Sequence, residues 1–151
     1  MNNRPLVPIY IKIILIVLAL GIAILTLLPF GVRMVFASKG VDGRMELHPE
    51  YYSYYDKMPL GYGRWSVMFV FIFSILEALS TILFFFKKKE RTGLLIYIII
   101  DIAVAILQVT DILFYFSVTW VNFVLLGIAV IAGGLAIYSN IKIDRTNLQQ
   151  R

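Results

Sequence analysis

The sequence predicts an all-α fold, an integral membrane four-helix bundle that forms one domain over residues 1–151. Three observations predict it. Apolar residues make up 60% of the chain and charged residues only 15%, which gives a mean hydropathy of +0.86. Four separate stretches reach the roughly 20 apolar residues that a helix needs to cross a bilayer. These stretches also lack the apolar–polar alternation of membrane β-strands.

The four predicted spans cover residues 6–30, 65–86, 93–115 and 118–138. A helix suits each of them, because a chain in lipid must satisfy its own backbone hydrogen bonds. The last three spans are joined by short links, so we expect them to be antiparallel neighbours. The first span leaves one alternative open, because Val35-Phe36-Ala37 has the small-residue pattern of a signal-peptidase site.

The basic residues predict the orientation of the spans. The link at residues 87–92 holds four of them, and Lys- and Arg-rich links usually face the cytoplasm. An even number of spans then places both termini inside. The inside segments carry nine basic against two acidic residues, and the loop at residues 31–64 carries five against four. We therefore predict a multi-pass protein of the cytoplasmic membrane, N-in and C-in, with an extracytoplasmic loop of 34 residues.

The same composition excludes several classes of protein. A soluble domain of 17.3 kDa has too much exterior to hide so many apolar side chains. An ordinary soluble enzyme, a disordered chain and a nucleic-acid-binding domain are thereby excluded. The chain has no cysteine, which excludes a disulfide scaffold and thiol catalysis. It also has no HExxH, GxSxG, P-loop or Rossmann pattern, so we expect no enzymatic activity, no cofactor and no metal.

The outer loop is punctuated by glycine and proline, which predicts an irregular cap with a short hairpin or an amphipathic helix. It is too small to fold alone, so we expect it to rest on the bundle or on the membrane surface. Its aromatic residues form either an interfacial belt or a surface that recognises a partner. These residues are Tyr51, Tyr52, Tyr54, Tyr55, Tyr62 and Trp65. Glu46, His48 and Glu50 alternate, but Pro49 interrupts them, and we expect no metal site there.

Two acidic residues lie near the middle of the predicted bilayer. Glu77 precedes Lys87 by ten residues, and Asp101 follows Arg91 by ten. At 1.5 Å per residue, both lie about 15 Å from the basic link, so they are candidates to face each other. Ionising two neighbouring carboxyl groups at once is energetically unfavourable in a medium of low dielectric. We expect them to share a proton, bind a cation or pair with a basic group.

Other polar residues extend this pair into a predicted seam. Ser74 and Thr81 share a helix face with Glu77, and Gln108 and Asp111 share one with Asp101. Lys12 either reaches toward the cytoplasmic surface or approaches Glu77. Charged residues inside a membrane usually mark function, yet the seam also has a structural interpretation as interhelical hydrogen bonds.

Small residues recur at intervals of four in the first and last spans, a spacing that favours close helix packing in lipid. They are Ala19, Ala23, Ala129, Ala132, Gly133 and Ala136. They indicate either a face for forming a homo-oligomer or packing inside one chain. In topology alone, the predicted arrangement is similar to that of claudin-type proteins. It lacks the cysteine pair of their outer loop, so this resemblance implies no function.

Our first functional hypothesis is a small non-enzymatic membrane protein of accessory, immunity or sensor type. It binds an extracytoplasmic or membrane partner, or a ligand, through the outer aromatic loop and the polar seam. The alternative is an oligomeric transporter or channel, coupled to protons or cations through Glu77 and Asp101. A third and weaker hypothesis is an enzyme that modifies or binds lipids.

Overall fold

The computed structural model describes most of the chain. The described residues are 7–28, 30, 32–39, 41–42, 44–53, 65–86, 89–114 and 119–149. Each of the four apolar stretches forms a helix: α1 (Ile9–Leu27), α2 (Trp65–Ser80), α3 (Glu90–Phe114) and α4 (Trp120–Gln149). A 3₁₀ segment, η1 (Thr81–Phe85), continues α2. All four are long and apolar enough to cross a membrane, which confirms this part of the prediction.

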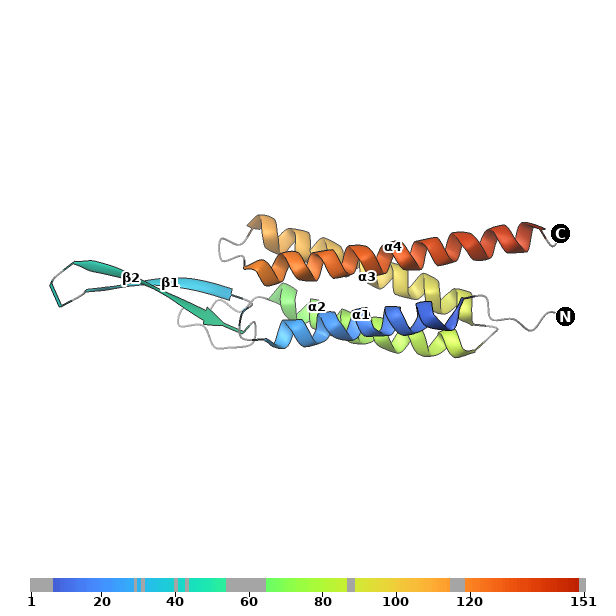
Figure 1. The fold of residues 1–151 in the computed structure, drawn as a ribbon, viewed down its shortest axis with the longest axis horizontal. Coiled ribbons are helices and arrows are strands. Elements are labelled where there is room, and N and C mark those ends of the chain that lie inside the picture. Colours follow the sequence, from blue (N-terminus) through green and yellow to red (C-terminus); the bar gives the residue numbers. More distant parts are fainter. Residues whose placement is uncertain are drawn as a thin grey trace.

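Helices that follow each other along the chain run antiparallel (Figure 1), and the contacts between the four close a ring. In this ring α1 packs against α2 and α4, and α3 packs against the same two helices from the opposite side. α1 and α3 are therefore diagonal neighbours. α1 begins and α4 ends at the same end of the bundle, and a β-hairpin extends from the other end.

Two apolar clusters fill the bundle, one above the other. The cluster nearer the start of α1 includes Leu15, Leu94 and Tyr97. The cluster nearer the hairpin includes Ile22 and Val104. Glu77 and Asp101 lie between the two clusters along their helices, and we call these two residues the carboxyl layer. The carboxyl layer thus separates the two apolar clusters of the core.

The small residues of the first and last spans lie inside this bundle. All six are buried against other helices of the same chain. They therefore let the helices of one chain approach closely, and the structure does not offer them as a face for a second copy. The outside of the bundle is covered instead by exposed apolar side chains, as expected for contact with lipid. Examples are Val17, Ile99, Ile106, Phe123 and Val130.

The second span differs from its prediction as one continuous helix. α2 ends at Ser80, and its last turn tightens into η1. The hydroxyls of Ser80 and Thr81 donate to carbonyls three residues earlier, a local bond that competes with regular helix geometry. The start of α3 packs closely on this turn: a Cβ added at Gly93 would lie 2.7 Å from Leu83 Cβ.

α4 is longer than its apolar stretch. The prediction ended at residue 138, where hydropathy falls, but the helix continues to Gln149. No glycine or proline interrupts residues 139–149. Backbone hydrogen bonding therefore continues after the side chains become polar, because hydropathy marks the bilayer boundary and does not mark the end of a helix.

The outer loop contains a two-stranded antiparallel hairpin of β1 (Val32–Lys39) and β2 (Met45–Tyr52). Its register pairs Val32 with Tyr52 and Lys39 with Met45. The hairpin was one of the forms expected for this loop. At its base the hairpin contacts the bundle, because Tyr52 packs against the apolar cluster near it, and its contact with a membrane surface stays a prediction. The hairpin extends beyond the helix ends, roughly along the bundle axis (Figure 1). Eight residues at about 3.3 Å each carry its tip about 25 Å outward.

Candidate functional site

The carboxyl layer consists of one acidic residue of α2 and one of α3 at the same level of the bundle. Glu77 is fully buried and Asp101 is 3% exposed. The two residues lie within electrostatic range of each other, and that their carboxyls face each other stays a prediction. They form no hydrogen bond with each other, because both Glu77 oxygens and Asp101 Oδ1 have no hydrogen-bond partner in the described structure. The layer therefore holds two acidic groups and lacks a donor to satisfy them.

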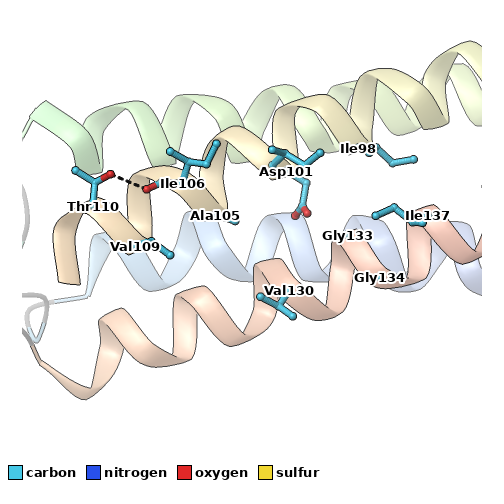
Figure 2. A pocket seen from close by; sticks show the side chains of 11 residues that line it. Ile98, Asp101, Ala105, Ile106, Val109, Thr110, Val130, Gly133, Gly134 and Ile137 are labelled. Atoms are coloured by element: carbon cyan, nitrogen blue, oxygen red, sulfur yellow. Dashed lines mark hydrogen bonds between the residues drawn. The ribbon is translucent and has the colours of Figure 1, made fainter. Parts of the chain in front are cut away.

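Asp101 is directed away from α2 and toward α4. Its carboxyl points between α3 and α4, beside Gly133 (Figure 2). A Cβ atom at position 133 would overlap Asp101 Oδ2. Only glycine leaves room for the carboxyl in this position, so the direction of the Asp101 side chain depends on Gly133.

A cavity of about 390 Å³ adjoins Asp101 on the α3–α4 side. Its walls are almost entirely apolar. They come from Ile98, Ile102, Ala105, Ile106, Val109, Val130, Gly133, Gly134 and Ile137, with Thr110 at one end. The Thr110 hydroxyl donates to the Ile106 carbonyl of its own helix. Asp101 therefore supplies the one ionisable group among the lining residues.

The hydroxyls of the predicted seam have partners on their own helix. Ser74 donates to the Phe71 carbonyl, and Thr81 donates to the Ala78 carbonyl. Both side chains are buried, as predicted, but neither hydroxyl donates to a carboxyl of the layer in these bonds. The seam is consequently less well satisfied than its composition suggests.

The predicted stripe on α3 faces the interior along its whole length. Gln108 and Asp111 are both fully buried, as is the face that carries Asp101. Ser66 on α2 donates to Asp111 Oδ1 over 2.5 Å. Neither the nitrogen nor the oxygen of the Gln108 side chain has a hydrogen-bond partner in the described structure. The stripe thus runs from Asp111 near the hairpin end, where Oδ1 accepts a hydrogen bond, to Asp101 at mid-bundle, where Oδ1 has no hydrogen-bond partner in the described structure.

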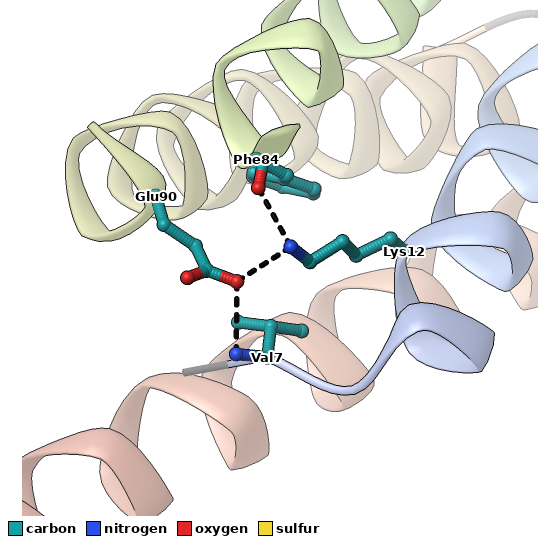
Figure 3. Close-up of polar contacts among 4 residues, drawn as sticks. All are labelled: Val7, Lys12, Phe84 and Glu90. Atoms are coloured by element: carbon teal, nitrogen blue, oxygen red, sulfur yellow. Dashed lines mark hydrogen bonds and ion pairs between the residues drawn. The ribbon is translucent and has the colours of Figure 1, made fainter. Parts of the chain in front are cut away.

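Lys12 does not approach Glu77, which corrects one of the two alternatives for this residue. Its ammonium lies 2.7 Å from Glu90 Oε1 and donates to the Phe84 carbonyl over 2.6 Å (Figure 3). The Val7 amide donates to the same Glu90 oxygen over 2.9 Å. Lys12 and Glu90 are both buried. The pair therefore ties the start of α1 to the start of α3.

Sequence reasoning missed two residues of this interior. Glu90 looked like part of a solvated charged link, and its position in the first turn of α3 was the available signal, since acids favour helix N-termini. Tyr97 was counted among apolar residues. It lies one turn before Asp101, and its hydroxyl donates across the bundle to the Leu15 carbonyl over 3.2 Å. Tyr97 also lies within electrostatic range of Glu77 and Asp101.

The aromatic residues of the outer loop are only partly described. Tyr51 is exposed, and Tyr52 packs against the apolar cluster near the hairpin. The Tyr52 hydroxyl donates to Glu50, and its ring meets that of Phe36 edge-on. Trp65 begins α2. The remaining members of the predicted set lie outside the described residues: Tyr54, Tyr55 and Tyr62.

The acidic residues of β2 form a small charged group. Glu46 Oε2 lies 3.5 Å from His48 Nε2, and both side chains are exposed. In the part of the chain that the structure describes, no three metal-binding side chains come together. Comparisons with protein-family models, with curated proteins and with solved structures find no match for the chain.

Proposed function

We propose that this chain is a non-enzymatic, multi-pass protein of the cytoplasmic membrane that binds an extracytoplasmic protein partner through the β1–β2 hairpin. The basic link and the charge difference between the two sides support an orientation with both termini in the cytoplasm. The hairpin then extends outward from the membrane. The observation that carries the proposal is the exposure of an apolar hairpin face that none of the described helices covers.

The register of the hairpin separates its side chains into two unlike faces. Residues paired across an antiparallel ladder share a face, and successive residues alternate. One face therefore holds mostly apolar residues with a basic residue at each end. Its members are Arg33, Val35, Ala37, Lys39, Met45, Leu47, Pro49 and Tyr51. The other face carries Ser38, Glu46, His48 and Glu50 together with Phe36 and Tyr52, which are half-buried and contact each other. We call the first the apolar face and the second the acidic face.

The apolar face has the character of a binding surface. Met45 is 79% exposed and Leu47 is 68% exposed, and Val35 and Tyr51 are also exposed. An isolated two-stranded hairpin is at best marginally stable in water, because it has no third layer on which to bury its side chains. A partner that covers the apolar face supplies that layer. Pro49 removes one backbone donor from β2, which favours recognition by this face over strand addition along β2.

Site-specific photo-crosslinking in living cells tests this proposal. A photoreactive residue at Leu47 lies on the apolar face, and one at Glu46 lies on the acidic face as a matched control. We expect a discrete adduct from position 47 that is absent or weak from position 46. Val35→Lys places a charge on the apolar face and is expected to abolish the adduct. An adduct with twice the mass of the chain identifies a second copy as the partner.

Two results would contradict the proposal. One is equal crosslinking from both faces, which indicates random collision. The other is an adduct at position 47 that survives Val35→Lys at the same expression level. In either case the hairpin does not recognise a partner through its apolar face.

A second candidate function is supported by the carboxyl layer. An oligomeric transporter or channel coupled to protons or cations needs an acidic group inside the membrane that has no permanent partner, and Glu77 meets that condition among the described residues. The test is ion flux into liposomes that contain the purified protein, compared with Glu77→Gln. Equal flux through both proteins would count against this function.

A further inference from the structure

The cavity between α3 and α4 combines apolar walls with one buried acid that lacks a partner. We propose that it binds a hydrophobic organic cation, whose positive charge lies against the Asp101 carboxyl and whose apolar groups fill the cavity. This inference does not depend on the hairpin. It involves the same carboxyls as the proposed transporter or channel and would name the class of molecule that such a protein carries. Binding itself does not require transport.

The charge of the site calls for a cationic ligand. Asp101 Oδ1 and both oxygens of Glu77 are buried without a hydrogen-bond partner in the described structure. A buried acidic group without compensation is costly, and an opposite charge is one way to stabilise it. Lys12 does not serve this role, because Glu90 and the Phe84 carbonyl hold its ammonium. Neither carboxyl forms an ion pair with any described residue.

The walls of the cavity select the kind of cation. A bare metal ion such as Ca²⁺ takes about six to eight oxygen ligands, and the lining residues offer one carboxyl and one hydroxyl that already donates within its helix. An organic cation carries its charge among carbon groups, and those groups suit a wall of isoleucine, valine and alanine. The volume of about 390 Å³ falls in the usual range for small-molecule sites.

The cavity is reached from the outside of the bundle. Five of its apolar lining side chains are exposed on the bundle surface: Ile102, Ile106, Val109, Val130 and Ile137. They lie along the part of α3 and α4 that is apolar enough to span a membrane. A ligand therefore enters from the hydrocarbon region of the bilayer, where hydrophobic cations partition and hydrated ions do not.

Two adjacent glycines of α4 give the cavity its shape and also provide the tools to test it. Gly133 leaves room for the Asp101 carboxyl. A Cβ added at Gly134 would meet nothing within 4 Å, although this residue lines the cavity. A Cβ added at Gly127 would also meet nothing within 4 Å, and Gly127 is not among the lining residues. Leucine at 134 thus fills the cavity without removing the acid, and leucine at 127 is its matched control.

The experiment measures binding of tetraphenylphosphonium to the full-length protein in lipid nanodiscs by equilibrium dialysis, with empty nanodiscs as the blank. Tetraphenylborate has nearly the same shape and the opposite charge. We expect saturable binding of the cation above the blank and no saturable binding of the anion. Asp101→Asn is expected to weaken binding of the cation about tenfold or more, since it removes a charge-assisted contact.

Control variants separate binding from folding. Asp111→Asn removes an equivalent charge from α3 outside the cavity, and we expect it to bind the cation like the parent chain. Gly134→Leu is expected to abolish binding and Gly127→Leu to leave it unchanged. Gel filtration and helical circular dichroism check each variant. If Asp101→Asn does not fold, the comparison of the two leucine variants decides.

Three results would overturn the inference. They are equal binding of the cation and the anion, no saturable binding of either, or binding that Gly134→Leu leaves intact. The first indicates a cavity that accepts any apolar molecule, such as a lipid chain. Crosslinking from position 47 in the same variants reports on the hairpin separately. Binding without ion flux would leave the inference standing while it removes the second candidate function.

Discussion

Replacing Lys12 by methionine tests whether the Lys12–Glu90 pair holds the start of the bundle together. The substitution keeps the apolar stem and removes the ammonium, so Glu90 keeps its charge and loses its counter-ion. Both side chains are almost fully buried, at 6% and 1% exposed. Removing one partner of a buried ion pair costs about 3–5 kcal/mol, whereas an exposed pair contributes about 0.2–1 kcal/mol. We take about 3 kcal/mol, because the Val7 amide still donates to Glu90.

A double-mutant cycle measures the interaction itself. Glu90→Gln keeps the shape of the side chain and removes its charge, and we expect it to cost about 2 kcal/mol. Each single substitution already breaks the interaction between Lys12 and Glu90. The loss in free energy of unfolding of the double variant is therefore expected to be about 2 kcal/mol smaller than the sum of the losses of the two single variants. The assay is reversible unfolding in mixed micelles, followed by circular dichroism.

A surface lysine provides the control for this cycle. Lys89 lies beside Glu90 in sequence and is exposed. Lys89→Met is expected to change the free energy of unfolding by less than about 0.5 kcal/mol. Additive single costs, or a Lys12→Met effect as small as that of Lys89→Met, would refute the argument that this pair ties α1 to α3.

Three further predictions concern packing and hydrogen bonds, and the same unfolding assay measures each. Gly93→Ala is expected to destabilise the protein by about 1–3 kcal/mol, because the added methyl group meets the preceding turn. The control Gly127→Ala adds a methyl group that meets no atom, so it is expected to be neutral or slightly stabilising. Equal effects of the two substitutions would contradict this packing. Ser66→Ala removes the hydroxyl that donates to buried Asp111 and is expected to cost about 1–3 kcal/mol, so an unchanged stability would show that the bond contributes nothing. Tyr97→Phe is expected to cost about 0.5–1.5 kcal/mol, and a gain in stability would argue against its bond across the bundle.

The helices were predictable because the bilayer offers the backbone no hydrogen-bonding partners. An uninterrupted apolar stretch of about 20 residues has to satisfy its own hydrogen bonds, and a helix does this within the segment. The predicted depth of Glu77 and Asp101 followed from counting residues along those helices. The split of the second span was not predictable by hydropathy, since it depends on side-chain bonds from Ser80 and Thr81 to the backbone.

The partners of the interior acids were harder to predict than their positions. Periodicity places Asp101 on an inward face, but it does not say whether the carboxyl turns to α2 or to α4. That choice depends on Gly133, a residue that the sequence pattern marked only as small. Glu90 was missed for a related reason. Its burial results from α1 placing Lys12 beside it, a long-range contact that no local pattern of charge reports.

The pairing of Asp101 with Gly133 limits how this sequence can vary. A side chain at position 133 would occupy the space of the carboxyl as it now lies, so the acid would have to turn away. Descendants of this chain that keep Asp101 in this position are therefore expected to keep Gly133 as well, although 31 intervening residues separate the two along the chain.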